Sequence, residues 1–236
     1  MRVAVVIPTR NEAGSIARVL RDIPRPPATD VIVVDAASTD GTAAIAESEG
    51  ARVVVEPRRG YGRACLTGIE HAAGADIVVF LDGDYSDRPA ELPRLVDPIC
   101  AGAADIAIGS RLAGVRAPGA LPWHSIAGNW TAARFIRLLY GVRVTDLGPF
   151  RAARMETIRA LGLRETGYGW AVELILRGAL AGARIVEVPV SYHPRIGQSK
   201  ITGTVSGSLG AAWYIFGRIF QYRLQRVGGA PTAADV

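Results

Sequence analysis

The sequence predicts an α/β fold in which a mostly parallel sheet is flanked by helices. Unbroken apolar runs occur at Val3–Ile7, Val31–Val34, Val53–Val55 and Ile77–Leu81, with a weaker run at Ile106–Ile108. Runs of this length without polar alternation are typical of strands buried on both faces of a parallel sheet. Helical patterns separate the runs, and polar residues cluster directly after three of them. Strands that alternate with helices in this way build a doubly wound sheet.

The segments between the runs have helical spacing and helix-end signals. Ile16, Val19, Leu20 and Ile23 are spaced i, i+3, i+4 and i+7, which gives a single apolar stripe. Asp40 can cap a helix over residues 42–48 that ends at Gly50. Pro89 stands where a further helix, through Leu95, would begin.

The second half of the chain predicts fewer strands. Helices are expected at 125–140, 154–161 and 170–180, and short strands at 150–153 and 185–188. A segment with several glycines and serines then leads to an apolar and basic stretch near the C-terminus. We expect one domain over residues 1–203, an amphipathic helical segment over 204–227 and a flexible tail over 228–236.

Length and composition exclude several classes of protein. The 236 residues are 49% hydrophobic and 21% charged, which suits one large domain and excludes wholesale disorder. The net charge of +5 favours anionic partners such as phosphates and lipid head groups. The basic residues are almost all Arg, which we attribute to coding bias, so no nucleic-acid partner is expected.

Cysteine content and hydropathy indicate in which cellular compartment the protein is expected. Cys65 and Cys100 are expected to be free thiols in a reducing cytosol, because disulfides are rare there. The N-terminal apolar run is too short for a signal peptide, and no run reaches about 18 apolar residues. We therefore expect a cytoplasmic protein without a membrane-spanning helix.

The strongest local signal is the sequence FLDGDYSD at residues 80–87. The preceding strand delivers Asp82 and Asp84 to its carboxyl end with one glycine between them. Two carboxylates in this arrangement can share a hard divalent cation, Mg²⁺ or Mn²⁺, that also takes water and substrate phosphates as ligands. The alternative is an ordinary acidic turn at a strand end.

Two further polar clusters follow the first and second strands. They are PTRNE at residues 8–12 and DAASTDGT at residues 35–42. Each alone is consistent with a capped strand-to-helix turn, but sheets of this kind bind ligands at the carboxyl ends of their strands. The glycine patterns of a dinucleotide-binding turn and of a P-loop are both absent from the sequence. The three clusters together predict a ligand at this edge of the sheet.

In order and spacing, IPTRNE, VVDAASTDGT and FLDGDYSD resemble the nucleotide-sugar-binding half of family-2 glycosyltransferases. The later TDLGPFRAAR, GYGWAVELILRG and EVPVSYHPRIGQSKITGT resemble the branch that contains dolichyl- and polyprenyl-phosphate glycosyltransferases. The resemblance runs from about Arg2 to Thr204 and implies a GT-A fold. It also implies an inverting, metal-dependent enzyme that moves a sugar from a nucleotide-diphosphate sugar, of the GDP-mannose or UDP-glucose type, to a polyprenyl or dolichyl phosphate.

The resemblance implies roles for residues on the donor side. The residues expected to bind the nucleotide sugar are Pro8, Arg10, Glu12, Asp35, Arg63 and Asp82. Asp82 and Asp84 would hold the metal, and water or Asp87 would complete its shell because Ser86 stands where some relatives have a further ligand. Ala36 replaces a second aspartate that is usual in the family, which leaves the identity of the base open.

On the acceptor side, the residues expected to bind the acceptor or its phosphate are Arg111, Ser125, Glu173, Arg195 and Lys200; Glu173 is selected because it shares a helix face with Trp170 at i, i+3. Lys200 is the only lysine of the chain and lies within a matched motif, and a compact ammonium suits a single phosphate oxygen. Leu121 stands where dolichyl-phosphate mannose synthases have an arginine that helps to hold the acceptor phosphate.

Asp84, Asp146 and Arg111 are the expected catalytic residues. Asp146 stands where related enzymes that act on hydroxyl acceptors have their general base. A phosphate monoester is already ionised at pH 7 and needs no base. Three functions therefore stay open at this point, namely transfer to a lipid phosphate, transfer to a hydroxyl with Asp146 as base, and sugar-nucleotide binding without transfer.

The apolar and basic stretch at residues 211–227 is expected to lie on the cytoplasmic face of a membrane. Trp213, Phe216, Phe220 and Leu224 share one face of a helix, and arginines follow them. Aromatic rings and basic residues in this arrangement attach a helix to an anionic lipid surface. The alternatives are that the helix packs on the protein's own core or on a second subunit of a homo-oligomer.

Overall fold

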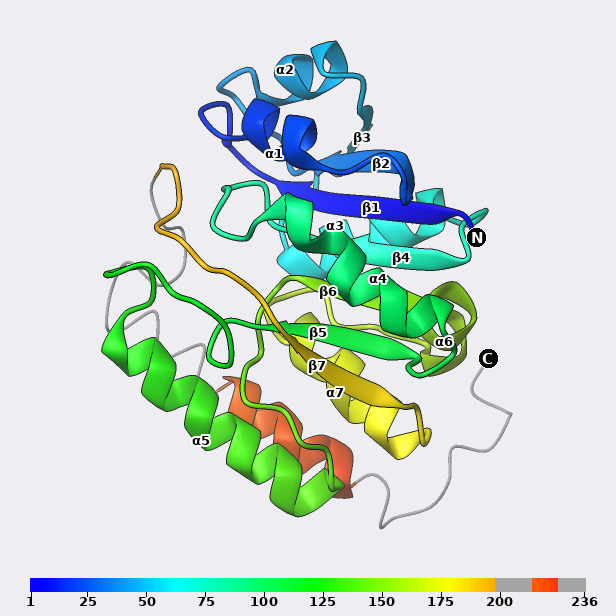
Figure 1. Cartoon of the computed structure of the whole chain (residues 1–236), viewed down its shortest axis with the longest axis vertical. Coiled ribbons are helices and arrows are strands. Elements are labelled where there is room, and N and C mark those ends of the chain that lie inside the picture. The colour runs from blue at the N-terminus through cyan, green and yellow to red at the C-terminus, as the bar shows by residue number, and fades with distance from the viewer. Residues whose placement is uncertain (198–213, 225–236) are drawn as a thin grey trace.

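The computed structural model describes residues 1–197 and 214–224 (Figure 1). Its centre is a seven-stranded sheet with the strand order β3-β2-β1-β4-β6-β5-β7. The strands are β1 (Val3–Thr9), β2 (Ala28–Asp35), β3 (Arg52–Val55), β4 (Ile77–Phe80), β5 (Ile106–Ser110), β6 (Arg151–Arg154) and β7 (Ile185–Pro189). The helices are α1 (Ile16–Asp22), α2 (Thr42–Ser48), α3 (Tyr61–His71), the 3-10 turn η1 (Pro89–Glu91), α4 (Leu92–Cys100), α5 (Trp123–Tyr140), α6 (Met155–Leu161) and α7 (Trp170–Leu180). A further helix spans residues 214–224.

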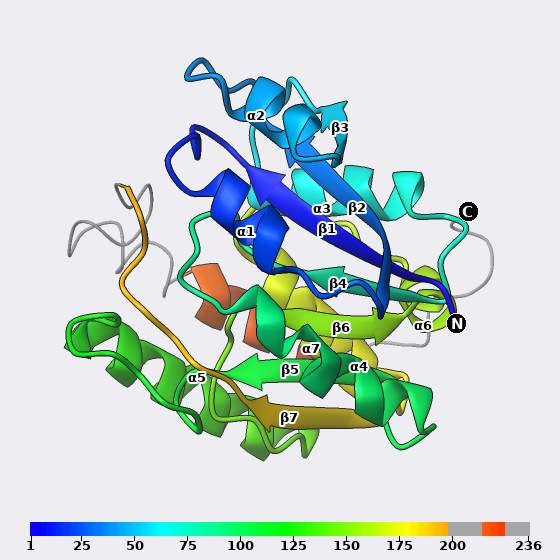
Figure 2. The same cartoon turned by 45° about the horizontal axis from the view of Figure 1, so that its top comes forward.

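The prediction of a mostly parallel sheet is confirmed. All five apolar runs form strands, and β1, β2, β3 and β4 pair in parallel, as do β5 and β7. The exception is β6, which enters between β4 and β5 and runs antiparallel to both. Figure 2 shows this reversal, with the arrowhead of β6 opposite to those of β5 and β7. A short strand at residues 150–153 is predicted from the sequence, but the pattern does not indicate the direction of this strand.

Each face of the sheet has its own core. Along β1, Val3, Val5 and Ile7 point to the face covered by α1, α2 and α4. Ala4 and Val6 point to the opposite face, where α3, α5, α6, α7 and the 214–224 helix pack. Alternation of side chains along a strand explains why its whole sequence is apolar when both faces are covered.

Gly68 of α3 lies close against β1 of the sheet. A Cβ at this position would overlap Val6 Cγ1 and lie 3.0 Å from Val6 Cγ2. We expect Gly68→Ala to lower the free energy of unfolding by about 1–3 kcal/mol, because an added methyl group would overpack the core at this point. Thermal denaturation checks this, with Gly128→Ala in α5 as the control, because a Cβ there meets nothing within 4 Å. An equal melting temperature for the two variants would contradict the expectation.

The 214–224 helix packs on the protein itself, which corrects part of the sequence prediction. Ile219 is fully buried, and Phe216 packs against the core and against the ring of Phe135 in α5. The hydroxyl of Tyr140 donates a hydrogen bond of 2.5 Å to the carbonyl of Ile219. Phe216 is therefore partly buried against the protein itself, whereas Phe220 and Leu224 are exposed. Trp213 and residues 225–227 lie outside the described residues.

Two other predictions concern thiols and membrane crossing. Cys65 and Cys100 are both free, Cys65 buried and Cys100 exposed, as expected. Within residues 1–197 and 214–224, no helix has the length and apolar character needed to cross a bilayer.

Candidate active site

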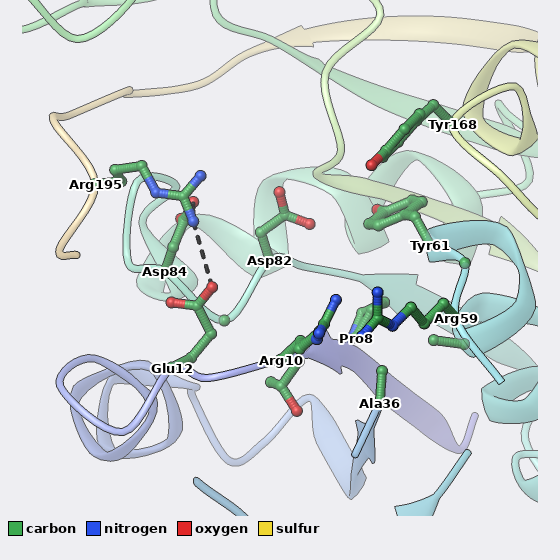
Figure 3. Close-up of a pocket in the computed structure, with 14 residues that line it drawn as sticks. Pro8, Arg10, Glu12, Ala36, Arg59, Tyr61, Asp82, Asp84, Tyr168 and Arg195 are labelled. Carbon is green, nitrogen blue, oxygen red and sulfur yellow. Dashed lines mark hydrogen bonds and ion pairs between the residues drawn. The ribbon is translucent and has the colours of Figure 1, made fainter. Parts of the chain in front are cut away.

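A cavity of about 360 Å³ lies at the carboxyl ends of β1, β2 and β4 (Figure 3). All three predicted polar clusters contribute to its wall. The residues that they supply are Pro8, Arg10 and Glu12 after β1, Ala36 after β2, and Asp82 and Asp84 after β4. This size is within the range of small-molecule sites. We call it the first cavity.

Hydrogen bonds between loops hold the wall of the first cavity in place. The amide of Glu12 donates to Thr42 Oγ1 at 2.8 Å, and Ser15 Oγ donates to the carbonyl of Gly83 at 2.8 Å. Gly83 is required here, because a Cβ would lie 2.7 Å from Thr9 Cγ2. The loops after β1, β2 and β4 are therefore fixed to one another before any ligand binds.

Two residues expected in the nucleotide site lie elsewhere. Asp35 is buried, and its carboxylate accepts hydrogen bonds from the amide and hydroxyl of Ser38, so Ala36 faces the first cavity in its place. The wall of the first cavity includes Arg59, from the loop before α3, and does not include Arg63, which lies in α3.

Asp82 and Asp84 lie near each other at the wall of the first cavity, and their negative charges repel. Burial and the nearby charge of Asp84 raise the pKa of Asp82 to about 7. Asp84 accepts hydrogen bonds from the amide and hydroxyl of Ser86, at 2.9 and 2.6 Å. Nη2 of Arg195 lies 3.2 Å from Oδ2 of Asp84 and 3.3 Å from Oε1 of Glu12. The guanidinium of Arg195 therefore offsets part of the negative charge of the acidic residues.

This pair fits a divalent cation. A cation between the two carboxylates would stabilise the charged form of Asp82, whose pKa is raised. Asp87 is buried behind them, and neither of its carboxylate oxygens has a hydrogen-bond partner. Over residues 1–197 and 214–224, no three acidic, histidine or cysteine side chains are arranged to hold a metal ion. Asp82 and Asp84 would therefore be its protein ligands, with the remaining positions left to water and substrate oxygens.

A second cavity, of about 230 Å³, opens beside the first. Ser125 and His124 at the start of α5 line it, together with Arg111 and the apolar side chains Leu121, Leu147, Ile215 and Phe216. Arg195 lines both cavities. The second cavity thus has basic groups where it meets the first and an apolar wall beyond them.

Arg111 and Asp146 form a nearly buried ion pair at the second cavity. The amide, Nε and Nη2 of Arg111 donate to the Asp146 carboxylate at 2.9, 2.7 and 2.8 Å. Burial alone would raise the pKa of Asp146, but the charge and hydrogen bonds of Arg111 hold it below its ordinary value. Asp146 is fully buried, and the carboxylate of Glu187 accepts from its amide at 3.1 Å. The geometry makes Asp146 a partner that orients Arg111 and not an accessible base.

Glu173 is placed differently from the prediction. It is fully buried, and its carboxylate accepts hydrogen bonds from the amides of Arg164 and Glu165, from Arg177 and from the hydroxyl of Tyr222. These contacts join α7 to its neighbours, so Glu173 is structural where the sequence suggested acceptor binding. Glu173 was predicted because it shares a helix face with Trp170. Trp170 is also buried, with its ring against that of Phe80. Lys200 lies outside the described residues.

Two tyrosines that the sequence analysis did not select also line the first cavity. Tyr61 and Tyr168 lie at the centres of two Gly-Tyr-Gly sequences, residues 60–62 and 167–169. The amide of Gly62 donates to the carbonyl of Gly167 at 3.1 Å, and a Cβ on Gly62 would lie 2.8 Å from Trp170 Cβ. The repeated Gly-Tyr-Gly pattern was the available signal, because small residues allow the two backbones to meet and bring both rings to the cavity (Figure 3).

Comparison with known proteins identifies the family. The model of glycosyl transferase family 2 matches residues 4–162. The chain belongs to this family. It is 40% identical over 210 residues to an uncharacterised glycosyltransferase of Mycobacterium tuberculosis, covering 88% of this chain and 93% of the relative. It is 37% identical over 227 residues to the undecaprenyl-phosphate mannosyltransferase of Micrococcus luteus, covering 88% and 90%. The polyprenol monophosphomannose synthase of Mycolicibacterium smegmatis is 34% identical over 218 residues, covering 86% and 82%.

Solved structures agree on the fold of this glycosyltransferase. Glucosyl-3-phosphoglycerate synthase from Mycobacterium tuberculosis, in complex with Mn²⁺, UDP-glucose and phosphoglyceric acid, superposes with a TM-score of 0.75. The two are 23% identical, and the match covers 94% of this chain and 79% of that one. The predicted GT-A fold is confirmed.

Proposed function

We propose that this family-2 glycosyltransferase transfers a hexose from a nucleotide-diphosphate sugar to a polyprenyl phosphate at a membrane surface. The observation that carries the proposal is the pair of adjoining cavities that share Arg195. One has the acidic pair and two tyrosines, and the other has basic groups beside an apolar wall. The second arrangement suits a phosphate attached to a hydrocarbon chain. Relatives named for undecaprenyl-phosphate and polyprenol substrates support the same acceptor class.

The donor is assigned to the first cavity. Arg10, Arg59 and Tyr61 line the part of the cavity that would take the nucleoside, and Asp82 and Asp84 would hold Mg²⁺ or Mn²⁺ near the diphosphate. The cation, when bound, neutralises charge that develops on the departing nucleoside diphosphate. The structural relative that was solved with Mn²⁺ and UDP-glucose supports this class of donor.

The reaction is a single displacement with inversion. A phosphate oxygen of the acceptor forms a bond to the anomeric carbon, while the bond from that carbon to the nucleoside diphosphate breaks and the diphosphate leaves with the electron pair. Since the acceptor oxygen is already ionised, no base has to remove a proton. Asp146 holds Arg111 by two side-chain hydrogen bonds, and Arg111 and Arg195 stabilise the acceptor phosphate in the second cavity.

The test is transfer from a panel of nucleotide sugars, with and without polyprenyl phosphate. We expect a lipid-linked sugar to form only when polyprenyl phosphate and a divalent cation are present, and the anomeric configuration of the product to be opposite to that of the donor. Transfer to a soluble hydroxyl compound in place of the lipid would favour the alternative in which Asp146 acts as a base. Retention of configuration would contradict the single displacement.

Arg195 provides a more specific prediction. Because its guanidinium lines both cavities, we expect Arg195→Ala to raise KM for both the donor and the acceptor, each about 10-fold or more, as loss of a charge-assisted hydrogen bond does. Steady-state kinetics with each substrate varied in turn measures the two effects. Arg25→Ala is the control, since Arg25 is exposed and precedes β2. An effect confined to one substrate would show that Arg195 serves a single cavity.

A further inference from the structure

The outward side of α5 is an exposed stripe of aromatic, apolar and basic residues. Trp123 is 79% exposed, Trp130 is 54% exposed and Leu138 is 78% exposed. Arg134 and Arg137 are exposed between Trp130 and Leu138. These positions share one side of a helix. Trp130 follows Trp123 by seven residues, Arg134 and Leu138 follow Trp130 at steps of four, and Arg137 follows Arg134 by three. We call this stripe the α5 outer face.

Large apolar side chains gathered on one helix face call for a partner. Single exposed apolar residues are normal on a protein surface, but a contiguous group that includes two tryptophans marks an interaction site. The 214–224 helix extends the group, because it lies beside α5 through contacts of Phe135 with Phe216 and Phe220 (Figure 1). Phe220 is 45% exposed and Leu224 is 69% exposed.

The charge of both helices is of one sign. The sequence of α5 includes Arg134 and Arg137 and no acidic residue, and the 214–224 helix includes Arg218 and Arg223 and no acidic residue. The guanidinium of Arg134 lies 3.9 Å from the centroid of the Trp130 ring. Tryptophan, leucine and arginine on one helix face are the residues by which a helix binds in the plane of an anionic lipid surface.

The same charges disfavour a second copy of the chain as the partner. A two-fold dimer through the α5 outer face would set this face against itself. Arg134 and Arg137 would then face a surface that carries the same positive charges, and neither helix supplies a carboxylate to pair with them. A bilayer with anionic head groups has the complementary charge.

The opposite side of α5 lines the second cavity. Ser125, Asn129 and Ala132 face that cavity, one helix diameter away from the outer face. That diameter is about 10–12 Å, and interfacial helices enter the head-group region by about 5–10 Å. A bilayer in contact with the α5 outer face would therefore hold its phosphate groups near the level of the second cavity.

We propose that the α5 outer face is the surface by which this glycosyltransferase lies on an anionic bilayer. The inference rests on the proposed function in one respect, which is that the acceptor is confined to the membrane. It moves the membrane contact from the C-terminal stretch, as the sequence analysis had it, to α5, with Phe220 and Leu224 at its border.

The experiment uses the full chain and vesicles of phosphatidylcholine, with or without phosphatidylglycerol. Two double variants test the two kinds of contact with lipid. Trp130→Ser with Leu138→Ser removes apolar contacts, and Arg134→Gln with Arg137→Gln removes positive charges. Trp123 is left intact because its ring contacts that of His124, which lines the second cavity. The matched controls are Val55→Ser, at an apolar residue 64% exposed on β3, and Arg25→Gln.

We expect the wild type to co-sediment with the anionic vesicles. The arginine variant should bind about 25-fold more weakly, since each basic residue near such a surface contributes about fivefold. The Trp130 and Leu138 variant should bind at least about 10-fold more weakly. Both controls should bind as the wild type does. Circular dichroism and melting temperature establish that every variant is folded.

A second readout separates this inference from the proposed function. With a short-chain prenyl phosphate that is soluble in water, both α5 variants should keep the wild-type rate, whereas their rate on polyprenyl phosphate embedded in anionic vesicles should fall. A wild type that does not bind anionic vesicles would overturn the inference, as would variants that bind like the wild type. Variants that lose a dimer but keep vesicle binding would assign the face to a second copy. Failure to use any prenyl phosphate, with vesicle binding intact, would count against the proposed function alone.

Discussion

Replacing Asp84 with asparagine should lower kcat by about 100-fold or more and leave the fold intact. The change removes one of two carboxylate charges from the proposed cation site without altering the volume of the side chain. The remaining Oδ1 can still accept the hydrogen bonds from the amide and hydroxyl of Ser86, so the loop after β4 keeps its support. Loss of activity with an unchanged melting temperature is therefore the expected pattern.

Two measurements make this prediction specific to a metal. Wild-type activity should disappear in excess EDTA and return with Mg²⁺ or Mn²⁺, and the Asp84→Asn variant should need a higher metal concentration for half-maximal rate. Asp97→Asn is the control, because Asp97 is exposed on α4 and the substitution is the same. A full rate in excess EDTA would rule out the metal-dependent mechanism.

Asp146→Asn should lower the free energy of unfolding by about 3–5 kcal/mol, because it leaves Arg111 nearly buried without its counter-charge. In a chain of this length that corresponds to a fall in melting temperature of roughly 6–20 °C. Activity should also fall, since Arg111 loses the carboxylate that orients it. Adding Arg111→Met to Asp146→Asn should restore part of the stability and none of the activity, so the two roles of the pair can be measured separately.

The same pair predicts a dependence of stability on pH. The pKa of Asp146 is lower in the folded protein than in the unfolded chain, so the stabilisation is fully present above the unfolded value of about 3.9. It is lost as the pH falls through the lower folded value. Urea denaturation between about pH 5 and pH 2 should show a shallower loss of stability for Asp146→Asn than for the wild type. Parallel curves for the two proteins would show that Asp146 does not contribute to acid unfolding.

Local sequence patterns predicted much of the fold. The apolar runs located β1 to β5, since strands covered on both faces contain few polar residues to confuse the pattern. The position of β6 between β4 and β5 was not predictable, because strand order depends on contacts between residues about 70 positions apart in sequence, such as Phe80 with Arg151. The C-terminal stripe was recognised as amphipathic, but a stripe alone does not reveal whether it faces lipid or the protein's own core.

The candidate site was predictable where a residue follows a strand directly. Pro8, Glu12, Asp82 and Asp84 reach the first cavity because the ends of β1 and β4 leave little freedom in where the next residues lie. Predictions that depended on a side chain's direction were weaker. Asp35 also follows a strand, yet it turns beneath its loop to accept hydrogen bonds from Ser38.

Arg195 links the two cavities thermodynamically as well as spatially. A single guanidinium that lines both sites and lies near Asp84 and Glu12 must be shared among the ligands that enter them. Any factor by which the donor changes the affinity for the acceptor must equal the factor by which the acceptor changes the affinity for the donor. Binding of a nucleoside diphosphate with and without a prenyl phosphate, measured in the wild type and in Arg195→Ala, gives this coupling free energy, and we expect the substitution to reduce it.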